Sequence, residues 1–125
     1  MRPLVFDAGA LIALERHDGR MVAIMRALVA AKHSAHVPAA VVAQVWRGSP
    51  RQHAVVRLLR AEAVRIHPLT DAVAYRIGLL LASSGTADVV DAHVAILARS
   101  LSAAVLTSDP GDLRLLDPTL SIVIV

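Results

Sequence analysis

Three aspartates in this chain stand directly after, or within two residues of, short runs of apolar residues: Asp7, Asp91 and Asp109. A carboxylate at the end of a buried element is costly unless a cation meets it. The runs before Asp7 and Asp109 have the length and composition of buried strands. If those strands are parallel neighbours, their carboxyl ends share one edge of a sheet, where ligand sites of open α/β sheets form.

Carboxylates that converge on such an edge predict a bound metal. Two of them 4 Å apart repel by about 4 kcal/mol at an effective dielectric constant near 20. A divalent cation is the simplest way to offset that repulsion. Because the donors are oxygen atoms, Mg²⁺ or Mn²⁺ is favoured over zinc.

Several polar neighbours could support these acids. Asp88 lies three residues before Asp91, so a helix would place both on one face. Thr107 and Ser108 could hold Asp109 or a metal-bound water. Ordinary structural roles compete: Asp7 and Asp88 could cap helices, and Asp109 could serve a turn before Pro110. Asp112 fits a first-turn acid of a short helix, with a minor role near the metal.

The predicted elements alternate between strands and helices. We expect strands over residues 4–6, 36–37, 64–67, 103–107 and 121–125, and helices over 8–15, 20–33, 38–46, 51–62, 71–83, 88–99 and 110–116. Pro38 fits the first residue of its helix, and Thr70 or Asp71 fits a cap. Such alternation predicts an α/β fold: a three-layer α/β/α sandwich with a mostly parallel central sheet.

Length and composition predict a single domain over residues 1–125 that stays in the cytoplasm. Cysteine is absent, so neither a disulfide framework nor a thiolate metal site is possible. Hydrophobic residues make up 56% of the chain, but charges interrupt every apolar stretch before it reaches membrane-spanning length. The first residues lead into a strand without a secretory leader. The apolar surplus is expected in a dimer or partner interface.

The net charge of +3 is a weak indication of nucleic-acid binding. Twelve of the thirteen basic residues are Arg, with Lys32 the exception. Arg suits bidentate phosphate contacts, although an Arg- and Ala-rich composition also follows from a GC-rich genome. The aromatic fraction of 2% argues against a stacking platform of the RNA-recognition or OB type.

Four segments together resemble the PIN domain, most closely the toxin nucleases of type II (VapBC) toxin–antitoxin pairs. They read VFDAGALIAL from residue 5, VPAAVVAQVWR from 37, DVVDAHVA from 88 and VLTSDPGDL from 105. The resemblance implies a ribonuclease that uses Mg²⁺ or Mn²⁺ to activate water against a phosphodiester. It implies catalytic roles for Asp7, Asp91 and Asp109, which with Asp88 would bind the metal.

Gln44 departs from the family pattern, which usually has Glu at this place. An amide oxygen can still coordinate Mg²⁺ but brings no charge. We expect Asp88 to compensate electrostatically, so that one metal binds well and a second weakly. Glu15 is the other possible replacement, although a solvated helix end suits it better. The alternative function is a PIN-fold module that binds RNA or an antitoxin without cleavage.

Basic and aromatic residues follow Gln44. The resemblance suggests that Arg47 and Arg51 hold RNA phosphates, with surface charge as the competing role for Arg47. Trp46 fits a core or interface plug. The six histidines show no metal-ligand spacing and are interpreted as structural or surface residues.

The partners implied by the resemblance are an RNA substrate, for which tRNA and rRNA are the candidates, and a small VapB-like antitoxin. The antitoxin's C-terminal segment would present an Arg to the acids, and the toxin would form a homodimer. Two other Asp-dependent classes are disfavoured. A haloacid dehalogenase phosphatase needs a second Asp where this chain has Gly9. A response-regulator receiver needs an acidic pair and a late Lys, and the chain's one lysine is Lys32.

Overall fold

The computed structural model describes residues 2–125, in which five parallel strands form one sheet. The strands are β1 (Leu4–Phe6), β2 (Ala35–Pro38), β3 (Val64–His67), β4 (Ala104–Thr107) and β5 (Ser121–Ile124). Their order is β3-β2-β1-β4-β5, and all four pairings are parallel. The predicted α/β sandwich with a parallel sheet is confirmed.

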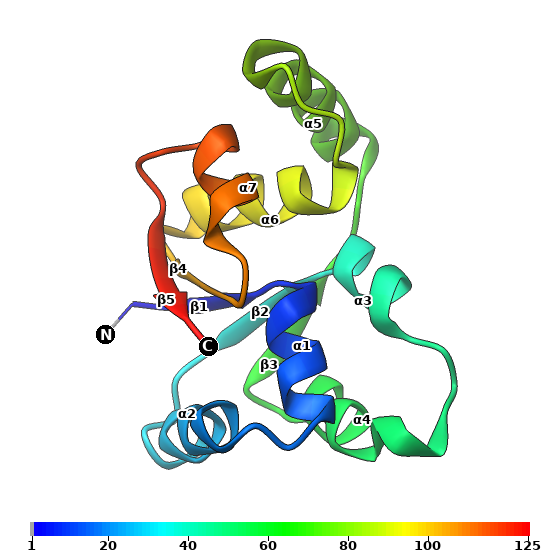
Figure 1. Cartoon of the computed structure of the whole chain (residues 1–125), viewed down its shortest axis with the longest axis vertical. Coiled ribbons are helices and arrows are strands. Elements are labelled where there is room, and N and C mark those ends of the chain that lie inside the picture. The colour runs from blue at the N-terminus through cyan, green and yellow to red at the C-terminus, as the bar shows by residue number, and fades with distance from the viewer. Residues whose placement is uncertain (1) are drawn as a thin grey trace.

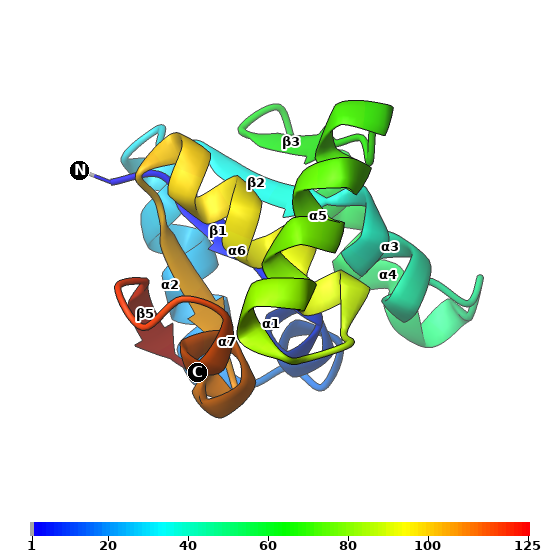
Figure 2. The ribbon, with the colours of Figure 1, turned by 90° about the horizontal axis from the view of Figure 1, so that it is seen from above.

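Helices cover both faces of this sheet (Figure 1). They are α1 (Ala8–Glu15), α2 (Gly19–Ala30), α3 (Ala39–Val45), the 3₁₀ turn η1 (Pro50–Gln52), α4 (His53–Leu59), α5 (Asp71–Ser84), α6 (Val89–Leu101) and α7 (Pro110–Leu116). Helices α1, α2 and α4 lie on one side, and α5, α6 and α7 on the other. Figure 2 shows α6 lying over β1 and β2, both of which it contacts.

The core explains why the central strands form where they do. Val5, Phe6 and Val105 are fully buried between the helical layers. Parallel strands buried on both faces read as continuous apolar runs rather than alternating ones. Helix α6 also has apolar residues on two sides: Val94 and Leu97 pack toward the sheet, and Ile96 packs in a second cluster with residues of α5 and α7. Helix α6 therefore joins α5 and α7 to the sheet.

Three predicted boundaries were wrong for identifiable reasons. Pro38 ends β2 instead of starting α3, because its extended backbone (ψ 139°) lets it pair with His67. The helix expected over 20–33 ends at Ala30, shortly before Lys32 takes a left-handed φ of 54°. The helix expected over 51–62 is split into η1 and α4 and ends at Leu59.

No single helix in residues 2–125 is long and apolar enough to cross a membrane. Helices α5 and α6 pass that test only as a pair, with a bend of 106° between them.

Candidate active site

From β1 the chain adds β2 and β3 on one side and then β4 and β5 on the other, so β1 and β4 are neighbours although far apart in sequence. The crevice outside the carboxyl ends of such strands is the usual ligand site of an open α/β sheet. Asp7 follows β1, and Asp109 follows β4 after Thr107 and Ser108. The N–H of Asp7 donates to the carbonyl of Leu106 at 3.2 Å, which ties the two strand ends together.

Asp7 is a buried carboxylate, 7% exposed, at the start of α1. Its Oδ1 accepts the N–H of Ala10 at 2.9 Å, so the predicted cap role is confirmed. Burial raises the pKa of Asp7, although hydrogen bonds from Thr107 and from the N–H groups of Ala10 and Gly9 oppose that rise. One cap bond leaves further oxygen lone pairs for a ligand.

Asp91 lies half-buried in the first turn of α6, and its pKa is strongly raised. Burial raises its pKa to about 6, and the charge of Asp88 adds most among its neighbours, followed by Asp112, Asp7 and Asp109. The other four aspartates predicted for the site therefore lie near enough to Asp91 for their charges to act on it.

Asp88 and Asp109 each precede a helix, but only the Asp88 side chain caps its helix. Asp88 is exposed and caps α6, accepting the N–H of Asp91 at 2.9 Å. Asp109 precedes α7, but its side chain makes no cap hydrogen bond. A carboxylate that is not used by its own helix is available for another partner.

Thr107 connects the two strand-end acids. Its buried hydroxyl accepts the N–H of Asp109 at 3.0 Å and hydrogen-bonds to the Asp7 carboxylate. Ser108 is exposed and packs against Gly9. A Cβ at Gly9 would collide with the Ser108 hydroxyl and lie 3.2 Å from its backbone nitrogen. The approach of α1 to the end of β4 therefore depends on a residue without a side chain.

The donors of this site have the chemistry that a hard cation prefers. Its five aspartates come from three segments of the chain, at the starts of α1, α6 and α7. Within residues 2–125 the one ion pair is elsewhere, between Arg99 and Asp117. In that same part of the chain, no group of three or more Asp, Glu, His or Cys side chains is arranged to hold one metal directly. The aspartates thus form a dispersed acidic cluster without a basic counterpart. Oxygen donors of this kind are those that Mg²⁺ and Mn²⁺ prefer.

The remaining predicted residues come from α3, from the segment after it and from the end of α1. Gln44 is exposed in the last turn of α3, a helix that contacts α1 and α6. Arg47 directs its guanidinium to the carbonyls of Ala43 and Trp46. Arg51 lines a hollow with Glu15 and His17 at the C-terminal end of α1, whereas Asp7 caps its N-terminal end. Glu15 is thus at the far end of α1 from Asp7.

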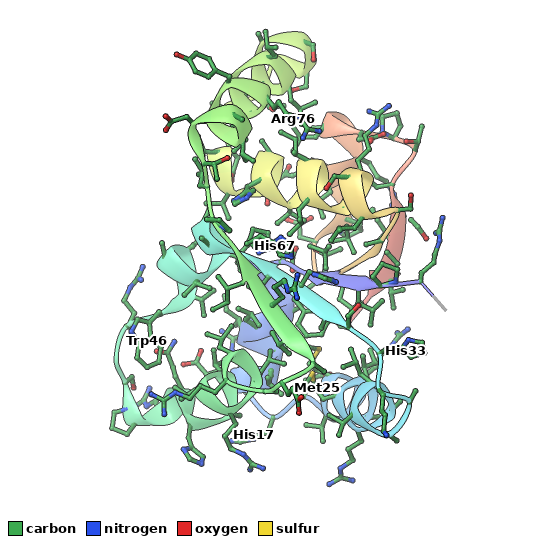
Figure 3. All side chains as sticks on the ribbon, turned by 180° about the vertical axis from the view of Figure 1, so that it is seen from behind. His17, Met25, His33, Trp46, His67 and Arg76 are labelled. Carbon is green, nitrogen blue, oxygen red and sulfur yellow. The ribbon has the colours of Figure 1, made fainter. Side chains whose placement is uncertain are left out.

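Gln52 has a role that sequence reasoning missed, and three histidines have contacts or burial that agree with their interpretation as structural residues. Gln52 is buried, accepts the N–H of Arg47 at 2.9 Å and donates to the carbonyl of Val45 at 2.7 Å. It therefore fixes the turn that holds Trp46, whose side chain is exposed (Figure 3). The rings of His36 and His67 are hydrogen-bonded, and His93 is buried. His36 and His67 lie on consecutive predicted strands, and this placement could have indicated their contact.

Comparisons with solved structures agree with this architecture. The fold is similar to that of VapBC2 from Rickettsia felis, solved bound to a promoter DNA fragment, with a TM-score of 0.74 at 15% identity over 98% of each chain. It is also similar to FitAcB from Neisseria gonorrhoeae (TM-score 0.64, 18% identity, 95% of each chain). PAE2754 from Pyrobaculum aerophilum gives a TM-score of 0.60 at 17% identity over 97% of this chain and 83% of that one.

No curated protein matches the sequence. Residues 4–116, which include all five aspartates and every helix and strand except β5, match the family model of the PIN domain. This chain belongs to the PIN domain family.

Proposed function

We propose that the chain is a metal-dependent endoribonuclease toxin of a type II toxin–antitoxin system. The observation that carries this proposal is the acidic cluster at the ends of β1 and β4, with no basic residue paired to it within residues 2–125. The PIN domain family is one of nucleases, which typically use divalent metals. The names VapBC2 and FitAcB among similar folds agree with the toxin assignment.

The charge of the site explains why a cation is required. A polyanionic RNA would be repelled by five carboxylates, so the substrate and the acids can share this edge only with a cation between them. In this proposal Asp7, Asp91 and Asp109 are the catalytic acids, and with Asp88 they hold Mg²⁺ or Mn²⁺. A bound divalent ion would lower the pKa of water and stabilise charge on the phosphoryl oxygens. Thr107 keeps Asp7 and Asp109 in register.

Cleavage of RNA by the purified protein tests this function. Wild type and Asp7→Asn are incubated with RNA and Mg²⁺ or Mn²⁺, and then with EDTA. Cleavage by wild type alone, lost with EDTA, is the expected result. Equal cleavage by both proteins would mean contamination. Binding of RNA without cleavage by either protein would favour the alternative, a binding module weakened by Gln44 and by the dispersion of the acids.

Asp88 is proposed to supply the charge that Gln44 lacks. Asp88 makes the largest contribution of any neighbouring charge to Asp91. Metal titration by calorimetry compares wild type with Asp88→Asn, which retains a cap acceptor for α6. Weaker metal binding with an unchanged melting temperature is expected. Equal affinity in the two proteins would remove Asp88 from the metal site.

The partners proposed for this cytoplasmic, single-domain toxin are RNA, a VapB-like antitoxin and a second copy of the chain. An antitoxin Arg would meet the unpaired acids. Helix α5 stands out from the sheet (Figure 1) and exposes Tyr75 by 79% and Leu79 by 73%, one helical turn apart. Exposed apolar side chains of this size favour an interface. Light scattering of wild type and Tyr75→Glu tests the homodimer, which the charged residue should dissociate.

A further inference from the structure

A buried histidine on α6 has no partner for one of its ring nitrogens. His93 is 2% exposed, and its Nδ1 makes no hydrogen bond with any residue in the described range 2–125. An unsatisfied buried polar atom costs about 1–3 kcal/mol, so native proteins rarely keep one without a reason. A ligand that supplies the missing hydrogen bond would be such a reason.

His93 lines a groove between the end of β3, the start of α5 and one flank of α6. The groove has a volume of about 260 Å³, and six of the residues that line it are His67, Thr70, Arg76, His93, Ile96 and Leu97. Figure 3 shows His67 at the end of β3 and Arg76 on α5. Sites for drug-sized ligands measure roughly 300–1,000 Å³, so this groove suits a single ring system.

The imidazole of His67 is held in one orientation within this groove. Its Nε2 lies 2.7 Å from Nδ1 of His36, whose Nε2 lies 3.1 Å from the hydroxyl of Ser34. The two ring centroids are 4.9 Å apart at an angle of 48°. A hydrogen bond to one imidazole nitrogen sets the tautomer and orientation of the ring. The Nδ1 and one face of His67 therefore remain for a ligand.

The chemistry of the groove favours a nucleobase over a phosphate or a metal. Apolar Ile96 and Leu97, a fixed imidazole and one buried ring nitrogen match a flat heterocycle with a polar edge. Splayed RNA bases are recognised in this way, by stacking on His or Arg and by hydrogen bonds to their edges. A phosphate would need several donors converging on it. The positive charge of Arg65, which faces both His36 and His67, opposes a cation.

The groove and the acidic cluster lie on the two flanks of the same helix. His93 follows Asp91 by two residues, which is about 3 Å along the axis and about 200° around it. Asp91 faces the other aspartates, and His93 faces His67. His67 also ends β3 at the same carboxyl edge at which Asp7 follows β1. His67 therefore places one end of the groove at the sheet edge that also carries the acids.

We propose that the groove lined by His67 and His93 binds a nucleobase of the RNA substrate, next to the nucleotide that is cut, and so determines sequence preference. This inference rests on the proposed ribonuclease function, because the base belongs to its substrate. His93 would supply a hydrogen bond to the base edge. His67 and Arg76 would stack on the base.

Base binding is measured without cleavage. Each of the four nucleoside 5′-monophosphates is titrated into metal-free protein, and the imidazole resonances are followed by NMR. The signals of His67 and His93 should shift with a preferred base, while those of the exposed His17 and His53 stay unchanged. His67→Ala, at a half-exposed position that should not disturb folding, should weaken binding about tenfold or more. His93→Gln, which retains a polar group, should weaken it less.

Three results would contradict the proposal that this groove binds a nucleobase. Inorganic phosphate alone could produce the same shifts, which would make the groove an anion site. Zn²⁺ could shift both His36 and His67 while no nucleotide does, which would make it a metal site. Affinity for every nucleotide could be the same in wild type and His67→Ala.

Cleavage of a random-sequence RNA separates this inference from the proposed function. His67→Ala should change the nucleotide preference beside the cut and raise KM more than it lowers kcat. Asp91→Asn should lose cleavage and retain base binding. Base binding without any RNA cleavage would contradict the function and leave the pocket standing. Cleavage with unchanged preference in His67→Ala would contradict the pocket and leave the function standing.

Discussion

Two aspartates of nearly equal burial, Asp7 and Asp117, have opposite environments. Asp117 is 5% exposed at the end of α7 and accepts the N–H of Thr119 at 2.9 Å, together with its hydroxyl. Arg99 lies 3.4 Å from its other oxygen. Asp7 is 7% exposed and faces further carboxylates instead of a base.

The pKa values follow this difference. Burial raises the pKa of Asp7, and the hydrogen bonds that it accepts do not offset that rise. Burial would also raise the pKa of Asp117, but the two bonds from Thr119 and the charge of Arg99 outweigh it and lower the pKa. Asp117 has both hydrogen bonds and a cation as partners, whereas Asp7 has hydrogen bonds but no cation.

The largest expected effect is the loss of activity in Asp7→Asn. Asn preserves the cap acceptor of α1, because Asn and Asp cap equally well, and removes only the charge. We expect cleavage to fall roughly 100-fold or more, as when one charge-stabilising group is removed from an active site. Initial rates of RNA cleavage check this. Activity within a few-fold of wild type would make Asp7 a structural residue like Asp117.

Asp117→Asn should show the reverse pattern. Removing the charge leaves Arg99 without its partner and weakens the bonds from Thr119, so the free energy of unfolding should fall by about 1–3 kcal/mol. Urea unfolding measures the change. Cleavage by the folded variant should match wild type. A large loss of activity at unchanged stability would contradict the contrast between the two sites.

The two sites should also differ in their pH dependence. The pKa of Asp91 rises from 3.8 to about 6 on folding, so between these pH values the folded state holds a proton that the unfolded state has lost. In metal-free buffer the free energy of unfolding should therefore decrease as the pH rises through this window, and level off above it.

Asp117 contributes in the opposite direction. Its folded pKa lies below 3.8, so its stabilisation is complete above that pH and is lost as the pH falls through the folded value. Unfolding experiments at several pH values would show a flatter curve for Asp91→Asn between pH 3.8 and about 6, and an unchanged slope there for Asp117→Asn. Identical curves for wild type and Asp91→Asn would contradict the raised pKa.

The smallest expected effect belongs to Gln44→Glu. This change adds an acid at an exposed place on α3, where solvent weakens its interaction with a bound ion. Metal affinity should rise by up to about tenfold, which corresponds to ~1.4 kcal/mol. Calorimetric titration with Mn²⁺ checks this, beside Gln44→Ala, whose affinity should match wild type. Equal affinities in all three proteins would place Gln44 outside the metal site.

The fold could be predicted largely from the sequence because the central strands are uninterrupted apolar runs. Phe6 on β1 and Leu106 on β4 are buried on neighbouring strands covered by helices on both faces, a pattern that belongs to parallel sheets. The error at Pro38 arose because proline suits both the start of a helix and an extended position. Tertiary pairing with His67 decides between these states, and a local pattern cannot show that pairing.

The site was predictable in its residue types but not in its charge balance. Asp7 and Asp109 could be placed because both follow strands. Asp112 was expected to have a minor role, yet its charge acts on Asp91 more strongly than that of Asp7 or Asp109. That ranking depends on how α7 docks beside α6, which follows from packing between helices distant in sequence. The hydrogen bonds of Gln52 and the unpaired nitrogen of His93 could not be predicted for the same reason, because they too depend on tertiary packing.

The contact between Gly9 and Ser108 sets a spacing that no charge controls. The Ser108 hydroxyl could rotate away from a Cβ at position 9, but that Cβ would still lie 3.2 Å from the backbone nitrogen of Ser108 and 3.3 Å from its Cβ. Asp7 begins α1 and Asp109 follows β4, so the small shift that relieves these contacts would move the two carboxylates apart while each retained its own charge. Gly9, which has no side chain, thus permits the close approach of α1 to β4 that sets the distance between Asp7 and Asp109.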